Sequence, residues 1–202
     1  AYPPWSMADA NGAVTGFDAD VGNMLCTKLA KECVFVVQAF DGLIPALQAN
    51  QFDVIISGMS ITDERKKQIA FSVGYAEFPN RFVVRKDSDL VAISDIPALL
   101  TALEGKKIGA QAATTHANFI AKLIPGADLR TYDTLDQQWI DLSSGRIDAA
   151  FADATADQDF LNKPEGADFA MAEAVIASAY DATRGEGIGV GRAQDNTELK
   201  AQ

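Results

Sequence analysis

The stretch Phe52–Ser72, FDVIISGMSITDERKKQIAFS, decides the local fold and carries the most distinctive chemistry of this chain. It begins as an apolar run, which predicts a buried strand, and then turns through small residues. Thr62 has the side chain of a helix N-cap, and two acidic residues follow it in the first helical turn. Arg65 falls in the same turn, beside free backbone N–H groups, and together these donors form a receptor for a carboxylate. The simpler alternative is that Arg65 only pairs with the two neighbouring acids.

The composition is that of a globular α/β protein. The chain has 202 residues, of which 48% are hydrophobic, and this suffices for one large or two small domains. Its net charge of −11 and its isoelectric point near 4.4 argue against nucleic acid or an anionic membrane as a partner. No run approaches the roughly 18 apolar residues that a transmembrane helix needs, and the numbered sequence shows no signal peptide.

Short apolar runs alternate with amphipathic segments along the chain, and this predicts strand–helix alternation. Strands are expected at Val34–Phe40, Asp53–Ser57, Arg81–Val84, Lys107–Ala110, Asp128–Tyr132 and Ala149–Ala152. Helices are expected at Asp18–Lys31, Leu43–Ala49, Asp63–Ile69, Ile96–Leu103, His116–Ile124, Asp136–Ser143 and Thr155–Asn162. The pattern predicts parallel sheets with ligand sites at the carboxyl ends of the strands. The alanine-rich stretch Glu165–Glu186 gives no clear pattern.

Six motifs occur along the chain in a fixed order. They are YPPW (Tyr2–Trp5), GFDAD (Gly16–Asp20), DGLIPAL (Asp41–Leu47), the Phe52–Ser72 segment, KIGAQAATT (Lys107–Thr115) and SGRIDAAFAD (Ser144–Asp153). Together they closely resemble the motifs of periplasmic polar amino-acid-binding proteins, the type II solute-binding proteins of ABC importers. Within that family the chain is most similar to the lysine/arginine/ornithine, histidine and opine binders.

The resemblance implies a two-lobed α/β fold with parallel-sheet lobes joined by a hinge. Lobe 1 would comprise residues 1–83 and 188–202, and lobe 2 residues 84–187. The crossing segments would lie near Arg81–Arg85 and Gly187–Val190, where the glycine-rich GEGIGVG would permit a hinge unless it is an ordinary surface turn. Compared with the family, the chain looks truncated at both ends, because the first strand and the closing helices are missing.

The resemblance also implies how the charged groups of a free amino acid are bound. Arg65 would bind the α-carboxylate, with the backbone N–H groups of Ser60 and Thr115 as further donors. Asp153 would bind the α-ammonium, with the Ser60 hydroxyl and the Gly58 carbonyl as partners. The alternative for Asp153 is a simple N-cap of the helix that follows it.

Other positions would contact the ligand side chain. Tyr2 and Phe40 match two rings that sandwich it, whereas Trp5 is expected to be core. Asp18 would either meet a distal amine or cap a helix, and His116 would be either an exposed first-turn residue or a contact of the ligand side chain. Rings and acids favour arginine, lysine, ornithine, histidine, glutamine or an arginine-derived opine over leucine, alanine and glutamate.

The two cysteines, Cys26 and Cys33, are seven positions apart. Helical periodicity places Cys26 on a helix, and the residues alone leave open both a disulfide in a chain that folds back and two buried free thiols. The basic amino-acid binders that the chain resembles carry a disulfide at this spacing, which implies a bridge and an oxidising compartment, the periplasm. No metal site is expected, because two cysteines and one distant His116 do not supply a ligand set.

The resemblance implies a binding module and not an enzyme. It would capture an amino acid or opine between two closing lobes, without a cofactor, and deliver it as a monomer to the membrane subunits of an ABC importer. One alternative on the same fold is a cyclohexadienyl dehydratase-like enzyme, for which Asp18, Glu77 or His116 are the candidate proton donors. The other is the extracellular sensor domain of a receptor.

Overall fold

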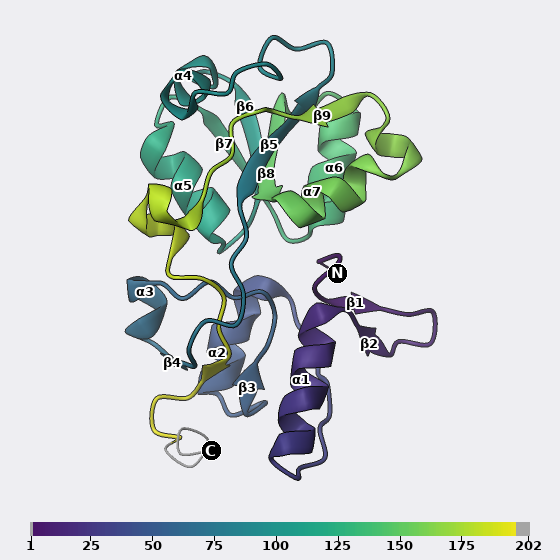
Figure 1. The fold of residues 1–202 in the computed structure, drawn as a ribbon, viewed down its shortest axis with the longest axis vertical. Helices are drawn as coiled ribbons and strands as arrows, with labels where there is room; N and C mark the ends of the chain where they lie inside the picture. Colours follow the sequence, from purple (N-terminus) through teal and green to yellow (C-terminus); the bar gives the residue numbers. More distant parts are fainter. Residues whose placement is uncertain (1, 197–202) are drawn as a thin grey trace. The chain divides into compact units, whose positions relative to one another are not determined.

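The computed structural model of this chain describes residues 2–196. These residues form two compact units (Figure 1). Unit 1 contains the described residues up to Glu77 and from Gly185 onward, and unit 2 is Phe78–Arg184. The expected lobe limits stay a prediction, and the last predicted segment, 188–202, extends beyond the described residues. No helix in residues 2–196 is long and apolar enough to cross a membrane.

Unit 2 is built on a five-stranded sheet in the order β7-β6-β8-β5-β9. Its strands are β5 (Asn80–Arg85), β6 (Lys107–Gln111), β7 (Asp128–Tyr132), β8 (Ala149–Asp153) and β9 (Phe169–Met171). Strand β6 runs parallel to β7 and β8, whereas β5 runs antiparallel to both β8 and β9. The expectation of a wholly parallel sheet is therefore wrong for this unit. The parallel strands β6, β7 and β8 follow one another in the sequence with helices between them, whereas β5, although a helix also follows it, pairs only with β8 and β9.

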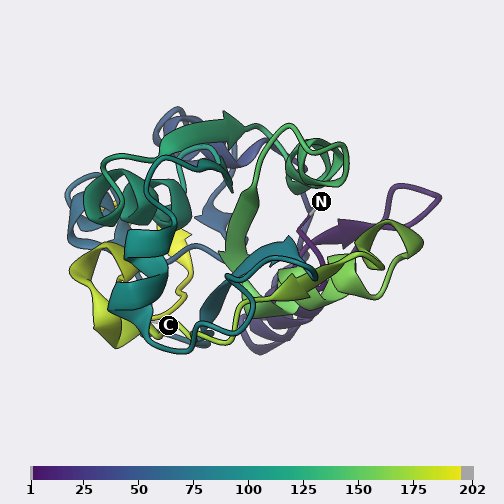
Figure 2. The same cartoon turned by 90° about the horizontal axis from the view of Figure 1, so that it is seen from above.

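Helices cover both faces of this sheet. They are α4 (Ile96–Ala102), α5 (Thr115–Leu123), α6 (Leu135–Ser143) and α7 (Ala154–Leu161), and 3-10 turns lie at η2 (Pro164–Gly166), η3 (Ser178–Tyr180) and η4 (Ala182–Arg184). Figures 1 and 2 show α4 and α5 on one side of the sheet and α6 and α7 on the other. The side chains of Asp95, Thr114 and Thr134 cap α4, α5 and α6 by accepting a backbone N–H of the first turn.

The core of unit 2 has one layer on each face of the sheet. In the first layer the rings of Phe82 and Phe151 stack at 4.2 Å, and Phe119 of α5 packs against them. On the other side Trp139 of α6 stacks on Phe160 of α7 at 4.4 Å. Because alternate residues of a strand face opposite layers, a strand covered on both faces is buried throughout, and in β8 all five residues are buried and the first four are apolar.

Unit 1 contains shorter elements. Its helices are α1 (Phe17–Lys28), α2 (Leu43–Gln48) and α3 (Asp63–Lys66), with a 3-10 turn η1 (Phe40–Gly42) before α2. Strands β1 (Met7–Ala8) and β2 (Val14–Thr15) pair with each other, and β3 (Val54–Ile55), β10 (Gly191–Arg192) and β4 (Ala70–Phe71) form a second sheet in that order. All seven predicted helices are thus present in the described part of the chain, with small differences at their ends.

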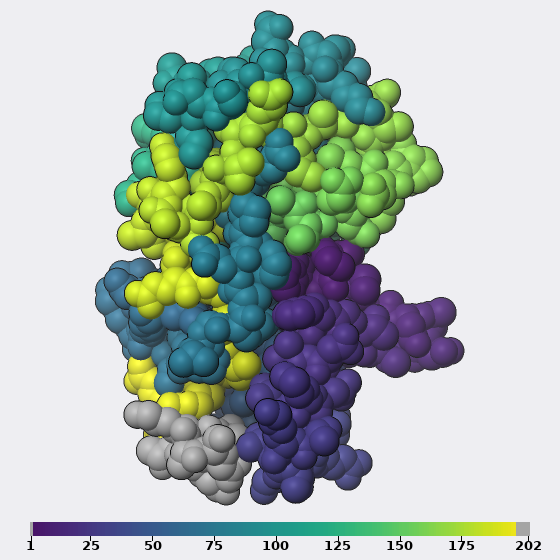
Figure 3. All heavy atoms as spheres, in the orientation of Figure 1, coloured from purple at the N-terminus to yellow at the C-terminus, as the bar shows by residue number. Residues whose placement is uncertain are grey.

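The segment that follows Gly185 pairs through backbone hydrogen bonds with the Phe52–Ser72 segment of unit 1. Its strand β10 pairs antiparallel with both β3 and β4, and the N–H of Ile61 donates to the carbonyl of Gly187 at 2.8 Å. Gly185 has a φ of +79°, and a Cβ there would lie 2.3 Å from the Ile61 carbonyl oxygen, so only glycine fits. Figure 3 shows these yellow residues against blue residues of unit 1. A hinge role of the glycine run stays a prediction.

The strand predicted at Val34–Phe40 is wrong. The segment has no regular structure before η1 begins at Phe40, and Val34 and Val37 are 84% and 74% exposed. Its β-branched residues satisfy the local pattern of a strand. A strand also needs the backbone of a neighbour, and no strand within residues 2–196 pairs with this segment.

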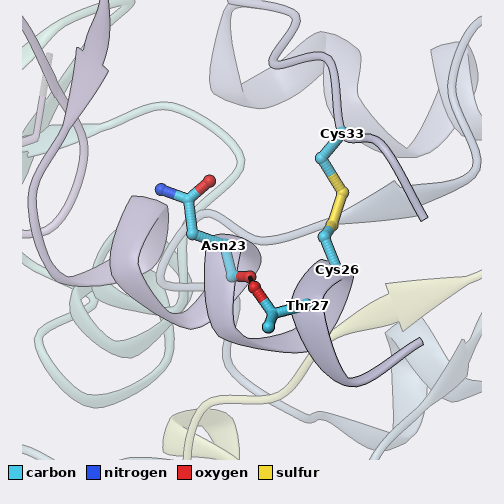
Figure 4. The surroundings of a disulfide bond; sticks show 4 residues. All are labelled: Asn23, Cys26, Thr27 and Cys33. Atoms are coloured by element: carbon cyan, nitrogen blue, oxygen red, sulfur yellow. Dashed lines mark hydrogen bonds between the residues drawn. A yellow bond between two sulfur atoms is a disulfide. The ribbon is translucent and has the colours of Figure 1, made fainter. Parts of the chain in front are cut away.

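The disulfide Cys26–Cys33 closes a short loop at the end of α1 (Figure 4). The chain reverses at Ala30, which has a φ of +50°, and the N–H of Lys31 donates to the carbonyl of Cys26 at 3.0 Å. This reversal brings the two Cα atoms to 6.0 Å, within the range of a disulfide. The pairing that the resemblance implied is confirmed, and Cys26 lies on the helix as predicted.

We predict that the double variant Cys26→Ser, Cys33→Ser loses about 2–3 kcal/mol of unfolding free energy, because a loop of this length restricts the unfolded chain by about that amount. Urea denaturation of oxidised protein and of the double variant measures the difference. Reductant added to the double variant is the control and should change nothing. Native protein whose intact mass shows two free thiols would contradict the bridge.

Candidate ligand-binding site

Arg65 is positioned by a capped turn of unit 1. The Thr62 side chain caps α3 and accepts the backbone N–H of Arg65 at 3.2 Å. The Arg65 side chain then turns inward: its Nη1 donates to the carbonyl of Ser60 at 2.9 Å, and its guanidinium lies 5.4 Å from the centre of the Phe40 ring. The residue is 9% exposed. The predicted Thr62 N-cap is confirmed, and the binding role of Arg65 stays a prediction.

The acids beside Arg65 have other partners. Asp63 lies 3.6 Å from Lys66, and Glu64 lies 2.6 Å from Lys67, each pair measured between the ammonium nitrogen and a carboxylate oxygen. These acids are exposed, whereas Arg65 is buried. The alternative that Arg65 serves only as a partner of its neighbouring acids is therefore not what the structure shows.

Asp18 is a buried acid whose carboxylate accepts two hydroxyl groups. It lies in the first turn of α1, and it accepts the hydroxyls of Ser6 at 2.7 Å and Tyr75 at 2.8 Å. Burial raises the pKa of Asp18, and the hydrogen bonds of Ser6, Tyr75 and the Gly58 backbone oppose this rise. Burial also raises the pKa of Tyr75 strongly, helped by the charge of Asp18. The N-cap of α1 is Gly16, so the capping role considered for Asp18 is wrong.

The remaining unit 1 residues have defined surroundings. Gly58 has a φ of +56°, a left-handed conformation that favours glycine. Ser60 pairs with Ile188 of the returning segment, and the N–H of Tyr2 donates to the carbonyl of Ser6 at 2.7 Å. Trp5 is buried, as predicted. The ring sandwich of Tyr2 and Phe40 stays a prediction.

Asp153 ends β8 in unit 2 and faces a buried polar cluster. It occupies the N-cap position of α7, as the alternative interpretation expected, although its side chain makes no capping hydrogen bond. Its Oδ1 instead accepts the Nδ2 of Asn80 at 2.5 Å and lies 3.3 Å from the Nε2 of His116. Asn80 is fully buried, and its Nδ2 is also 3.0 Å from the His116 ring.

His116 and Thr115 begin helix α5. Thr114 is the N-cap, and its hydroxyl donates to the carbonyl of Gln111 at 2.6 Å. The first-turn position expected for His116 is confirmed, but the residue is buried and packs edge-on against Phe151 at 5.4 Å, so the alternative of an exposed residue is wrong. Because Thr115 starts the helix, its backbone N–H belongs to the end that lacks intrahelical acceptors.

Arg184 is a residue of this cluster that was not predicted from the sequence. This residue ends η4, directly before the glycine run, and its side chain is 4% exposed. Its Nη1 donates to the Thr115 hydroxyl at 2.7 Å, its Nη2 lies 3.9 Å from Asp153 Oδ1, and its guanidinium lies 5.8 Å from the Phe151 ring. The available signal was an arginine at the end of a stretch otherwise rich in alanine.

Asp157 is a second acid close to Asp153. It lies one turn further along α7, it is fully buried, and neither of its carboxylate oxygens has a hydrogen-bond partner in the structure. Burial raises the pKa of Asp157 well above its ordinary value, the charge of Asp153 adds to the rise, and Arg81 opposes it.

Each unit therefore contains one buried charged group that could bind a ligand group of the opposite charge. Unit 1 holds a guanidinium against an aromatic ring, an arrangement suited to a carboxylate. Unit 2 holds a buried carboxylate among an amide, an imidazole and a guanidinium. Within residues 2–196, no group of three or more His, Cys, Asp or Glu side chains is placed to hold a metal ion.

The fold is that of type II periplasmic binding proteins. Among solved structures, a Salmonella typhimurium periplasmic binding protein with high arginine specificity superposes with a TM-score of 0.87 at 31% identity, covering 98% of this chain and 84% of that one. Residues 1–200 match the bacterial extracellular solute-binding proteins, family 3, and the chain belongs to this family. The family and fold predicted from the six motifs are confirmed.

The names of curated relatives agree with this family assignment. The chain is 37% identical over 203 residues to the lysine/arginine/ornithine-binding periplasmic protein of Escherichia coli K12, covering 99% of this chain and 75% of the relative. It is 32% identical over 223 residues to the octopine-binding periplasmic protein of Rhizobium meliloti, covering 100% of this chain and 74% of the relative. Both relatives are named as periplasmic binding proteins.

We predict that Asp157→Asn changes how stability depends on pH. The folded pKa of Asp157 lies above the unfolded value of 3.8, so the native state binds the proton more tightly, and wild-type stability is lost as pH rises from that value through the folded pKa. The amide of the Asp157→Asn variant cannot ionise, so the variant should not lose stability in this way as the pH rises. Urea denaturation between about pH 4 and about pH 8 measures both slopes.

The matched control is Asp159→Asn, a partly exposed acid on the same helix that pairs with Lys163. It should keep the wild-type slope. Parallel pH profiles of the wild type and Asp157→Asn would contradict the assignment.

Proposed function

We propose that this chain binds a free polar or basic amino acid, or an opine-like derivative, and delivers it to the membrane subunits of an ABC importer. The observation that carries the proposal is the pair of buried, opposite charges on the two units: Arg65 of unit 1 and Asp153 of unit 2. A free amino acid carries a carboxylate and an ammonium on one carbon, and these two residues match its two charges.

Arg65 binds the α-carboxylate in this proposal. The bond to the Ser60 carbonyl and the contact with the Phe40 ring fix the plane of the guanidinium before the ligand arrives. A fixed fork loses little side-chain entropy when it forms two parallel hydrogen bonds to a carboxylate. The N–H groups of Ser60 and Thr115 supply the further donors.

Asp153 binds the α-ammonium, with the Ser60 hydroxyl and the Gly58 carbonyl as further acceptors. Asn80 and His116 hold its carboxylate from one side and so fix its direction. One ligand molecule engages Arg65 of unit 1 and Asp153 of unit 2, and its preference for the closed arrangement shifts the population toward that state.

The ligand side chain is long and ends in a cation or an amide. Tyr2 and Phe40 supply rings for a methylene stem or a guanidinium plane. Asp18, oriented by Ser6 and Tyr75, supplies an acid, and His116 is a further contact. The names of the relatives support this class, because they bind arginine, lysine, ornithine or octopine.

The site of action is the periplasm, and the protein acts as a monomer. The relatives are periplasmic proteins, and the Cys26–Cys33 bridge suits an oxidising compartment. An acidic surface with a net charge of −11 suits a soluble carrier that meets its importer only transiently.

A thermal-shift screen of amino acids and opines tests the proposal, followed by calorimetry of the ligand that stabilises most. A basic or amide side chain should give the largest shift. Arg65→Ala should abolish the shift and cost about 2–5 kcal/mol of binding free energy, because truncating one partner of a desolvated charge pair leaves the other uncompensated.

Lys67→Ala is the matched control, since it removes an exposed cation that follows α3 and pairs with Glu64. It should bind as the wild type does. Near-normal affinity of Arg65→Ala would refute the carboxylate site, and a leading response to leucine or glutamate would refute the proposed side-chain class.

A further inference from the structure

Asp157 is a buried acid of unit 2 that the proposed function does not use. It lies in α7, one helical turn after Asp153. The residue is fully buried, and neither carboxylate oxygen has a hydrogen-bond partner among the described residues. Charging a buried carboxyl group that accepts no hydrogen bond is costly, so the protonated, neutral form is favoured. Asp157 therefore keeps a proton at a pH at which an exposed acid is already ionised.

Two charged neighbours act on Asp157 from the strands that α7 packs against. Strand β8 ends in Asp153, whose negative charge adds to the effect of burial and raises the pKa of Asp157. Strand β5 contributes Arg81, which lowers that pKa, although its guanidinium donates to the Ala172 carbonyl at 2.9 and 2.6 Å. Strand β9 contains no charged residue, and Glu165 of η2 is exposed. The proton on Asp157 thus depends on the charge of Asp153.

The other charged side chains of α6 and α7 are exposed or ion-paired. They are Asp136, which is exposed, Asp141, which pairs with Arg146 at 2.6 Å, and Asp159, which pairs with Lys163 at 2.7 Å. The proposed ligand contacts none of these groups. Among the charged neighbours of Asp157, Asp153 is therefore the one whose charge the ligand compensates.

An ammonium group at Asp153 changes the field that acts on Asp157. Resting on the proposed function, we infer that capture of the ligand's ammonium group by Asp153 releases a proton from Asp157. The O–H bond of the Asp157 carboxyl group ionises, the proton passes to the solvent, and a carboxylate remains in the field of Arg81. The two acids share one compensating positive charge in either state, which is the proton before binding and the ammonium group afterwards.

The sign of the pH dependence follows from this exchange of charges. The ligand-bound protein holds fewer protons than the free protein, so a rise in pH favours the bound state. Affinity therefore increases with pH between the pKa of Asp157 in the bound protein and its higher pKa in the free protein. The increase is about tenfold for each unit by which the ligand lowers that pKa. Outside this range the proton on Asp157 has no effect on affinity.

Calorimetric titration of the full chain with L-arginine, in buffers of different ionisation enthalpy, counts the protons released on binding. Measured between about pH 5 and about pH 9, the wild type should release up to about one proton per ligand, and its affinity should rise several-fold across the titration of Asp157. Asp157→Asn is nearly isosteric and cannot ionise, so it should lose this proton release and the accompanying rise in affinity. Groups that titrate in both proteins, His116 included, cancel in the comparison.

Asp159→Asn is the matched control, because it removes an ion-paired acid of the same helix, and it should release protons as the wild type does. Equal proton release by the wild type and Asp157→Asn would overturn the inference, and so would a wild type that binds arginine without releasing a proton at any pH in the range.

Infrared difference spectroscopy of the wild type supplies a second measurement that needs no folded variant. The carbonyl band of a protonated carboxyl group should disappear when arginine binds. A band that persists across the whole pH range would overturn the inference even if binding is tight. A wild type that binds no amino acid at all would refute the proposed function instead.

Discussion

The buried carboxylate of Asp153 is the constraint around which unit 2 is organised. An isolated charge in a protein interior is costly, so its neighbours must be donors. Asn80 reaches it from β5, His116 from α5 and Arg184 from η4, and three elements of the unit therefore converge on one side chain. The same charge acts on Asp157 one helical turn away, where burial and Asp153 together hold the pKa high.

Unit 1 also buries a charged group, but in this unit the group is a cation. Its buried guanidinium, Arg65, donates to the Ser60 carbonyl and lies against the Phe40 ring, and both contacts orient the group. A cation oriented in this way attracts an anion, and the carboxylate of Asp153 attracts a cation. The two units together thus show the charge pattern of a zwitterion, which is the chemical basis of the proposed amino-acid recognition.

Local chemistry made most of the fold and the site's main charges predictable from sequence. The Thr62 cap, the apolar run of β8 and the position of Asp153 at its end depend on neighbours within a few residues. The contacts that were not predicted join residues that are far apart in the sequence: Tyr75 meets Asp18 across 57 positions, and Arg184 meets Thr115 across 69. The strand expected at Val34–Phe40 failed for a related reason, because a β pattern forms a strand only beside another backbone.

Calorimetric titration with arginine, with agmatine, which lacks the carboxylate, and with guanidinovaleric acid, which lacks the α-amino group, tests the central claim most directly. The three compounds share one side chain, so differences in affinity report on the two charges of the amino acid alone. Loss of either charge should weaken binding about 30-fold or more, in line with a desolvated charge pair that loses one partner. Agmatine or guanidinovaleric acid binding as tightly as arginine would contradict recognition through Arg65 and Asp153.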